Sequence, residues 1–295
     1  MRIHSGLMLS TLVLTAQAAE LKQETVVAWQ EYVRSATAKM QDHLHGNADF
    51  IKADEDQDYA RRVRSGEILV SPAYRQGVTK VPNGLIHDWT GGAFIPNATL
   101  KEALSVVRDY DRYSEFYRPT VVDSKSLAKD GHGDRFSMVL MNKAMFMKTA
   151  LDSDYRCDFV RVDERRWYSI SETTRVQEIA DFGSADQHFL DENEGSGYIW
   201  RLFSITRFEE RDGGVYVELE AIALSRDIPG SLRWIVEPIV RRISRNSLAI
   251  SLRQTEQAVR AGVLAAGCKT QGQPCSTGRY SASASTGFGA LGLLH

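Results

Sequence analysis

The sequence predicts an α+β fold with an antiparallel sheet, one long C-terminal helix and an extra helix near the N-terminus. Segments of alternating hydrophobicity, separated by turn residues, dominate the middle third of the chain. A long helical stretch follows Pro238, a residue well suited to the first turn of a helix. Residues 25–44 carry apolar side chains at helical spacing. With 295 residues, 43% hydrophobic and 25% charged, the chain has the composition of a globular protein.

The charge balance argues against a polyanionic partner. The chain has 36 Lys and Arg against 38 Asp and Glu, a net charge of -2, so we expect no nucleic-acid binding. The sequence also contains no CxxC pair and no Cys/His spacing typical of zinc. The histidines are interpreted as loop or helix-end residues rather than metal ligands: His43, His45, His87, His132 and His188. We therefore expect no metal and no cofactor.

The first 18 residues have the three parts of an export signal. Arg2 supplies the basic start, residues 7–15 the apolar stretch, and Ala16-Gln17-Ala18 the small-residue cleavage site. The apolar stretch is shorter than the roughly 20 residues needed to span a membrane. We expect cleavage before Ala19 and a periplasmic or secreted protein; the alternative is a buried first helix.

In an oxidising compartment, Cys268 and Cys275 are close enough in sequence to form a small loop disulfide. Cys157, in a predicted strand, is interpreted as a buried and inert thiol. Residues 261–295 are rich in Ala, Gly and Ser without periodicity and are predicted to be a flexible tail. Residues 19–84 are predicted to hold the N-terminal helix and a charged connector that leads into a strand.

From residue 86 the predicted elements follow closely. Residues 86–90 form a strand that ends in a turn at Gly91-Gly92, and Thr99 caps a helix running to about Arg108. A short helix covers residues 111–117. The six strand segments that follow are 120–126, 134–142, 146–157, 159–174, 197–208 and 214–225.

The turn Asp212-Gly213 sets the register of the last two strands. It places Ser204 opposite Ala221 and Arg207 opposite Glu218. The face that holds Ser204 is apolar and mostly small, and we expect it to point inward; the face that holds Arg207 is mixed and is expected to meet solvent. A short helix over 231–236 and a long one from Pro238 to about Arg260 complete the prediction.

Several motifs resemble the START-like proteins of the SRPBCC superfamily. These are Trp89 to Pro119, including Asp109-Tyr110-Asp111-Arg112-Tyr113, then Gly197-Tyr198-Ile199-Trp200-Arg201, the Asp212-Gly213-Gly214 hairpin and Arg226-Asp227-Ile228-Pro229. The resemblance covers residues 85–260 as a START-like domain. It implies the helix-grip fold, in which a curved antiparallel sheet wraps around the C-terminal helix, and a hydrophobic ligand site between them.

Mapped onto this sequence, the resemblance places the wall of that site on the last hairpin and the long helix. The implied ligand-binding residues are Trp200, Leu202, Ser204, Leu219, Ala221, Ala223, Ile239, Ile243, Ser247 and Ile250. The alternative for each is ordinary core packing, since every folded sheet has an inward apolar face.

Three functions stay open. The first is an exported protein that binds a lipid or other hydrophobic small molecule without transforming it, with no catalytic residue. The second is a polyketide-cyclase-like or hydrolase-like enzyme in the same cavity, with Glu218, Glu220 or Asp227 as acid or base if the hairpin faces are inverted. The third is an interaction module whose N-terminal or C-terminal helix meets a partner or, transiently, a membrane surface. Whether the chain is an enzyme stays uncertain, with the weight against it, because no known catalytic motif occurs.

Overall fold

The computed structural model describes residues 19–46, 49–74, 76–129, 133–144, 147–228, 230–231 and 233–270. The predicted signal peptide, His132 and the predicted Cys268–Cys275 disulfide lie outside the described residues. No helix in the part that is described combines the length and the hydropathy needed to cross a membrane.

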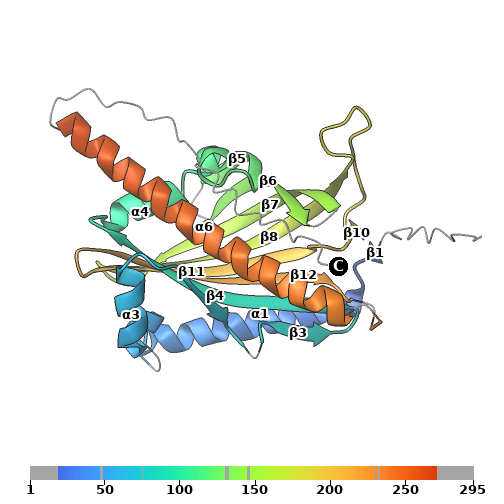
Figure 1. The fold of residues 1–295 in the computed structure, drawn as a ribbon, viewed down its shortest axis with the longest axis horizontal. Helices are drawn as coiled ribbons and strands as arrows, with labels where there is room; N and C mark the ends of the chain where they lie inside the picture. Colours follow the sequence, from blue (N-terminus) through green and yellow to red (C-terminus); the bar gives the residue numbers. More distant parts are fainter. Residues whose placement is uncertain are drawn as a thin grey trace, which may run out of the picture.

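The described strands form one large antiparallel sheet in the order β2-β4-β12-β11-β8-β7-β6-β5, with β3 paired to β4 and β9 paired to β8 (Figure 1). A separate short pair joins β1 to β10. The strands are β1 (Ala19–Glu20), β2 (Leu69–Pro72), β3 (Val78–Val81), β4 (Gly84–Pro96), β5 (Val121–Lys129), β6 (Asp134–Ala144), β7 (Met147–Arg161), β8 (Arg166–Ala180), β9 (His188–Phe189), β10 (Glu194–Gly195), β11 (Arg201–Arg211) and β12 (Gly214–Arg226).

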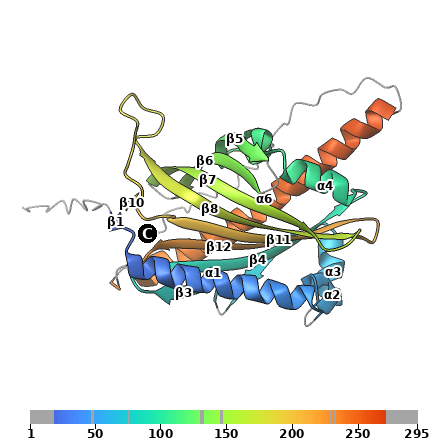
Figure 2. The same cartoon turned by 180° about the vertical axis from the view of Figure 1, so that it is seen from behind.

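Helices cover both faces of this sheet. They are α1 (Gln23–Leu44), α2 (Lys52–Glu55), α3 (Gln57–Arg64), α4 (Leu100–Val107), the 3-10 helix η1 (Tyr110–Arg112), α5 (Tyr113–Phe116) and α6 (Arg233–Thr270). Figure 1 shows α6 crossing one face, and Figure 2 shows α1 along the opposite face. We call the α6 side the inner face and the α1 side the outer face. The predicted α+β architecture, with a sheet against a long C-terminal helix and an N-terminal helix, is confirmed.

The predicted hairpin register is confirmed residue for residue. Ser204 lies opposite Ala221, Arg207 opposite Glu218 and Arg211 opposite Gly214. Asp212 and Gly213 both have positive φ, 56° and 77°, the conformation that matches the twist of a two-residue hairpin. The local turn therefore decided which side chains of β11 and β12 share a face. The predicted cap of α4 is also present, since the Glu102 backbone N–H donates to Thr99 Oγ1 at 3.3 Å.

The predicted turn at Gly91-Gly92 is wrong, because β4 runs through both glycines to Pro96. On the inner face, a Cβ at position 91 would lie 2.7 Å from Leu252 Cδ1 of α6. On the outer face, a Cβ at position 92 would collide with the Tyr59 hydroxyl of α3. The glycines allow helices to approach both sides of one strand closely.

The expectation that the Arg207 face meets solvent is also wrong. Arg207 and Glu218 are 6% and 4% exposed, and their side chains form an ion pair with Arg207 Nη2 2.7 Å from Glu218 Oε1. Neighbouring apolar side chains of this face, such as Phe203 and Ile222, pack into one core cluster with Trp29 and Met40 of α1. The N-terminal helix thus covers the outer face.

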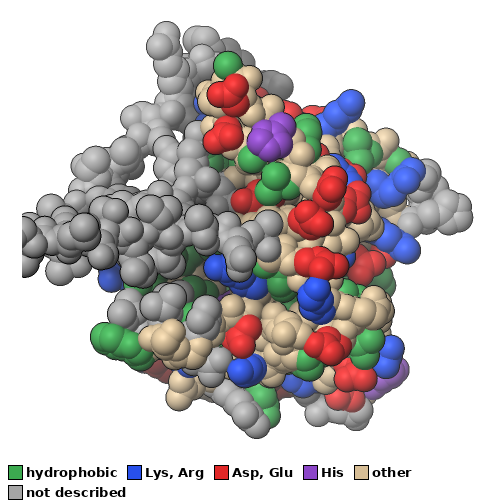
Figure 3. All heavy atoms as spheres, turned by 90° about the vertical axis from the view of Figure 1, so that its right-hand side faces the viewer, with side chains coloured by type: hydrophobic (Ala, Val, Ile, Leu, Met, Phe, Trp, Pro, Cys, Tyr) green, Lys and Arg blue, Asp and Glu red, His purple; other side chains and the backbone are tan. Residues whose placement is uncertain are grey.

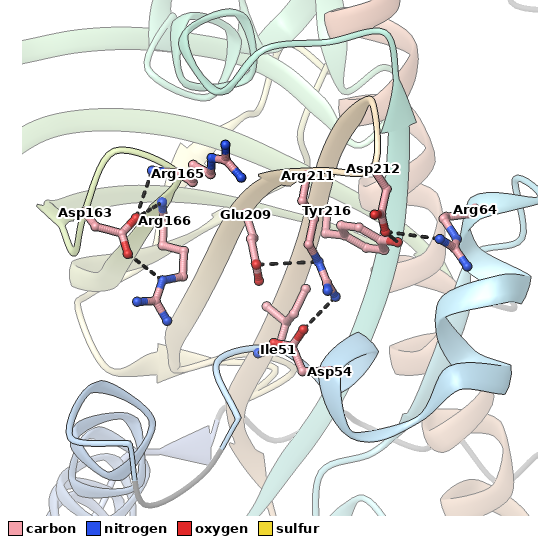
Figure 4. A network of polar contacts seen from close by, with 10 residues as sticks. All are labelled: Ile51, Asp54, Arg64, Asp163, Arg165, Arg166, Glu209, Arg211, Asp212 and Tyr216. Atoms are coloured by element: carbon pink, nitrogen blue, oxygen red, sulfur yellow. Dashed lines mark hydrogen bonds and ion pairs between the residues drawn. The ribbon is translucent and has the colours of Figure 1, made fainter.

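Residues 45–84, predicted as a charged connector, are a packed part of the fold. They form α2, α3, β2 and β3, and both strands pair with β4. Figure 4 shows how charged side chains attach α2 and α3 to the hairpin: Arg211 reaches Asp54 at 2.6 Å, and Arg64 reaches Asp212 at 3.1 Å. Tyr216 donates a hydrogen bond to the same Asp212 carboxylate at 2.8 Å. The segment's charges therefore make specific contacts with the sheet.

Two other boundaries differ from prediction. The stretches 146–157 and 159–174 were expected to be separate strands divided at residue 158, but β7 continues to Arg161 and the turn comes after it. The two predicted C-terminal helices are a single helix, α6, with Pro238 in its second turn. At that position proline removes only one helical hydrogen bond. The helix also extends to Thr270, ten residues beyond its expected end.

Candidate ligand cavity

A cavity of about 400 Å³ lies between the inner face of the sheet and α6. Its size falls in the range of pockets that hold small molecules. The cavity exists because the middle of the sheet presents small side chains there. Ser171, Ser204 and Ala221 are directly opposite one another on β8, β11 and β12, and all three line the space.

The α6 side of the cavity is also built from small side chains. Ser244, Ser247 and Ser251 lie at helical spacing and line the cavity, as do Leu248 and Leu252 next to them. Ser244 and Ser251 are partly buried, and Ser247 is exposed. Small side chains on both sides leave room between α6 and the sheet.

Aromatic side chains form the wall on the β6–β7 side. The ring of Phe136 is stacked between those of Tyr110 and Tyr155, with centroids 4.1 Å and 4.9 Å away and planes nearly parallel. Tyr113 donates its hydroxyl to the Val107 carbonyl at 2.6 Å. Tyr110 donates to Asp134 at 2.9 Å. These rings are therefore held in place by contacts of their own.

The described lining residues include no Lys, Arg, Asp or Glu side chain. The one imidazole in the wall, His87, is 4% exposed, and burial lowers its pKa to about 4, so it is neutral at pH 7. Burial also raises the pKa of the Cys157 thiol to about 12, so this thiol is not ionised at neutral pH. The described wall therefore carries no charge at neutral pH.

The structure places seven of the ten predicted site residues in the cavity wall: Leu202, Ser204, Leu219, Ala221, Ala223, Ile243 and Ser247. Three lie elsewhere. Trp200 packs in the outer core cluster with α1, Ile250 is 49% exposed on the far side of α6, and Ile239 is not among the lining residues. The predicted helix stripe included Ile243 and Ser247 but missed Ser244 and Ser251, which also line the cavity.

The sequence analysis missed the aromatic wall. Tyr110, Phe136 and Tyr155 come from three elements that are distant in sequence, and only the sheet topology brings them together. Alternation along β6 and β7 places Phe136 and Tyr155 on the inner face, which was the available signal. Their pairing in register across the two strands was not predictable from either strand alone.

The three carboxylates considered as acid or base do not line the cavity. Glu218 and Glu220 are on the outer face, with the Arg207 side of the hairpin. Asp227 follows β12 and lies 3.3 Å from Lys80 of β3. Because the predicted register is correct, the inversion of faces that this alternative required does not occur.

No protein-family model matches this chain. No curated protein matches it in sequence either. Solved structures that are similar to it include a STAR-related lipid transfer protein fragment from Xanthomonas axonopodis, at 14% identity and TM-score 0.40, which covers 67% of this chain and 98% of that one. Human STARD10 has 8% identity and TM-score 0.41, covering 73% of this chain and 82% of that one. The Zhui aromatase/cyclase from Streptomyces sp. R1128 has 9% identity and TM-score 0.41, and the match covers 62% of this chain and 98% of that one.

In this chain, a twisted antiparallel sheet holds a long C-terminal helix against its inner face, with a cavity between the two whose described lining residues carry no charge. That arrangement is a helix-grip fold.

Proposed function

We propose that this protein is an exported binding protein that holds a lipid or other hydrophobic small molecule between the sheet and α6. The observation that supports the proposal is the cavity itself, about 400 Å³ and lined mainly by apolar, aromatic and small hydroxyl side chains. An interaction module with a filled core would not need such a space. The acid–base alternative is not supported, because Glu218, Glu220 and Asp227 are not among the lining residues.

Native mass spectrometry of the protein purified from its own host tests the proposal. A stoichiometric apolar adduct, released by solvent extraction and identified, is the expected result. The variant Ser204→Leu places a larger apolar side chain on the cavity floor and is expected to reduce the adduct strongly, because it occupies the ligand's space.

The matched control is Thr174→Leu. Thr174 lies on β8, the strand next to β11, but its side chain is exposed to solvent. This variant should keep the adduct. A bare wild-type chain that also fails to take up fluorescent fatty alcohols or quinones would contradict the binding function, as would equal adduct levels in Ser204→Leu and wild type.

Export is part of the proposal and is tested separately. We expect the mature chain to begin at Ala19, so N-terminal sequencing of protein from the envelope or medium should read Ala-Glu-Leu-Lys. Replacing Ala18 with Lys should leave the leader attached. A mature cytoplasmic protein that retains Met1 would contradict export without affecting the binding proposal.

A further inference from the structure

We propose that the cavity selects an uncharged ligand with an oxygen acceptor, and that this oxygen is bound by the hydroxyl of Tyr155. The inference rests on the proposed binding function and specifies the chemical class of its ligand. It excludes free fatty acids and other anions from the cavity. The observations behind it are the charge of the wall and the unsatisfied hydroxyl of Tyr155 within it.

The charge argument comes first. Burying an ionised carboxylate without a countercharge is very costly, so pockets for anions contain Arg or Lys or a cluster of backbone N–H groups. The described wall has no basic side chain. Its polar groups are neutral and most of them are hydroxyls, among them those of Ser171, Ser204 and Ser251. A neutral ligand enters such a space without that penalty.

The second argument is the Tyr155 hydroxyl. Tyr155 lines the cavity and is 6% exposed, yet its hydroxyl has no hydrogen-bond partner in the described protein. A buried unpaired hydroxyl costs roughly 1–3 kcal/mol, and native proteins rarely leave one unsatisfied. The hydroxyls of Tyr110 and Tyr113, in the same wall, both have acceptors. Of these three tyrosines, Tyr155 is therefore the one whose hydroxyl remains for a ligand; Trp89 Nε1 and His87 Nδ1, on β4, also lack a partner among the described residues.

The surroundings of Tyr155 strengthen this assignment. Ser153, two residues earlier on the same face of β7, is fully buried, and its Oγ also lacks a hydrogen-bond partner among the described residues. Ser153 is not among the residues that line the cavity, so of these two hydroxyls the one that a ligand can reach is that of Tyr155. The Tyr155 ring is held by its stack on Phe136, so the donor is positioned before the ligand arrives.

Three probes of nearly equal shape test the inference: 2-acetylnaphthalene, 2-ethylnaphthalene and 2-naphthoate. Affinities for the full mature chain and its variants are measured by fluorescence titration at pH 7. The ketone should bind at least tenfold more tightly than the carboxylate. Tyr155→Phe should weaken ketone binding about five- to tenfold, the size expected for one hydrogen bond, and should change binding of the hydrocarbon less than twofold.

Tyr113→Phe is the matched control, because that hydroxyl lines the same wall but already donates to a carbonyl. It should leave the ratio of ketone to hydrocarbon affinity unchanged. Urea unfolding of both variants confirms that they are folded. Using the ratio of two ligands in each variant removes any general change in the cavity.

The outcomes separate this inference from the proposed function. Saturable binding of ketone and hydrocarbon, with no selective effect of Tyr155→Phe, would overturn the role of Tyr155 while the cavity function stands. Equal affinity for ketone and carboxylate would overturn selection for neutral ligands. If none of the three probes binds and native mass spectrometry finds no adduct, the proposed function fails, and this inference fails with it.

Discussion

The buried ion pair between Arg207 and Glu218 offers a quantitative test of whether helices cover the outer face of the sheet. Glu218→Gln removes the negative charge but keeps the size of the side chain. Arg207 stays charged at any accessible pH, and in the folded protein it is 6% exposed. Glu218 also accepts a hydrogen bond from the Lys52 backbone N–H of α2 at 2.9 Å, so the change also affects the contact between the helices and the sheet.

The expected cost follows from burial. Breaking a buried pair by removing one partner costs about 3–5 kcal/mol, because the remaining charge is uncompensated. That is a large part of the 5–15 kcal/mol typical of a folded domain. Urea unfolding followed by circular dichroism gives the change in free energy of unfolding from the midpoint and slope.

The matched control is Glu115→Gln. Glu115 accepts from Arg112 at 3.0 Å, but both side chains are more than half exposed, 57% and 51%, so the expected cost is about 0–1 kcal/mol. Replacing both buried partners, as Arg207→Met with Glu218→Leu, should recover most of the loss. A cost below 1 kcal/mol for Glu218→Gln, equal to that of the control, would refute burial of this face under α1 and α2.

Two further predictions concern the outer face. Burial beneath α1, with Asp88 nearby, raises the pKa of Glu220 from 4.5 to about 7. The folded protein therefore binds this proton more tightly than the unfolded chain does. The resulting contribution to the free energy of unfolding is fully present below pH 4.5 and is lost as the pH rises through 7. Glu220→Gln should stabilise the protein at pH 8 by at most about 3 kcal/mol and flatten the decline between pH 4.5 and 7 in urea titrations; an unchanged pH profile would contradict this. Gly92→Ala should cost about 1–3 kcal/mol by overpacking against the Tyr59 hydroxyl, and Tyr59→Phe should restore part of it. Gly230→Ala, with open space at its Cβ, is the control, and a loss as large as that of Gly92→Ala there would argue against steric contact as the cause.

Local signals in the sequence determined the elements whose geometry depends on near neighbours. The Asp212-Gly213 turn decided the β11–β12 register, because loop length and positive φ leave one pairing. Thr99 and Glu102 determined the start of α4 through mutual hydrogen bonds. The inward direction of Ser204 and Ala221 then followed from alternation along the strands, and with it a large part of the cavity floor.

Tertiary structure alone decided what covers each face and what remains empty. A cross-strand pair such as Arg207 and Glu218 is typical of a solvated sheet face, and only the packing of α1 and α2 over this face buries the pair. Two consecutive glycines such as Gly91 and Gly92 are typical of a turn, but in the folded protein they allow helices to pack closely on both sides of β4. The stack of Tyr110, Phe136 and Tyr155, and the space beside it, depend on strands and helices far apart in the chain. Periodicity in one segment identifies a side chain's face, but the partner of that face is set by the whole fold.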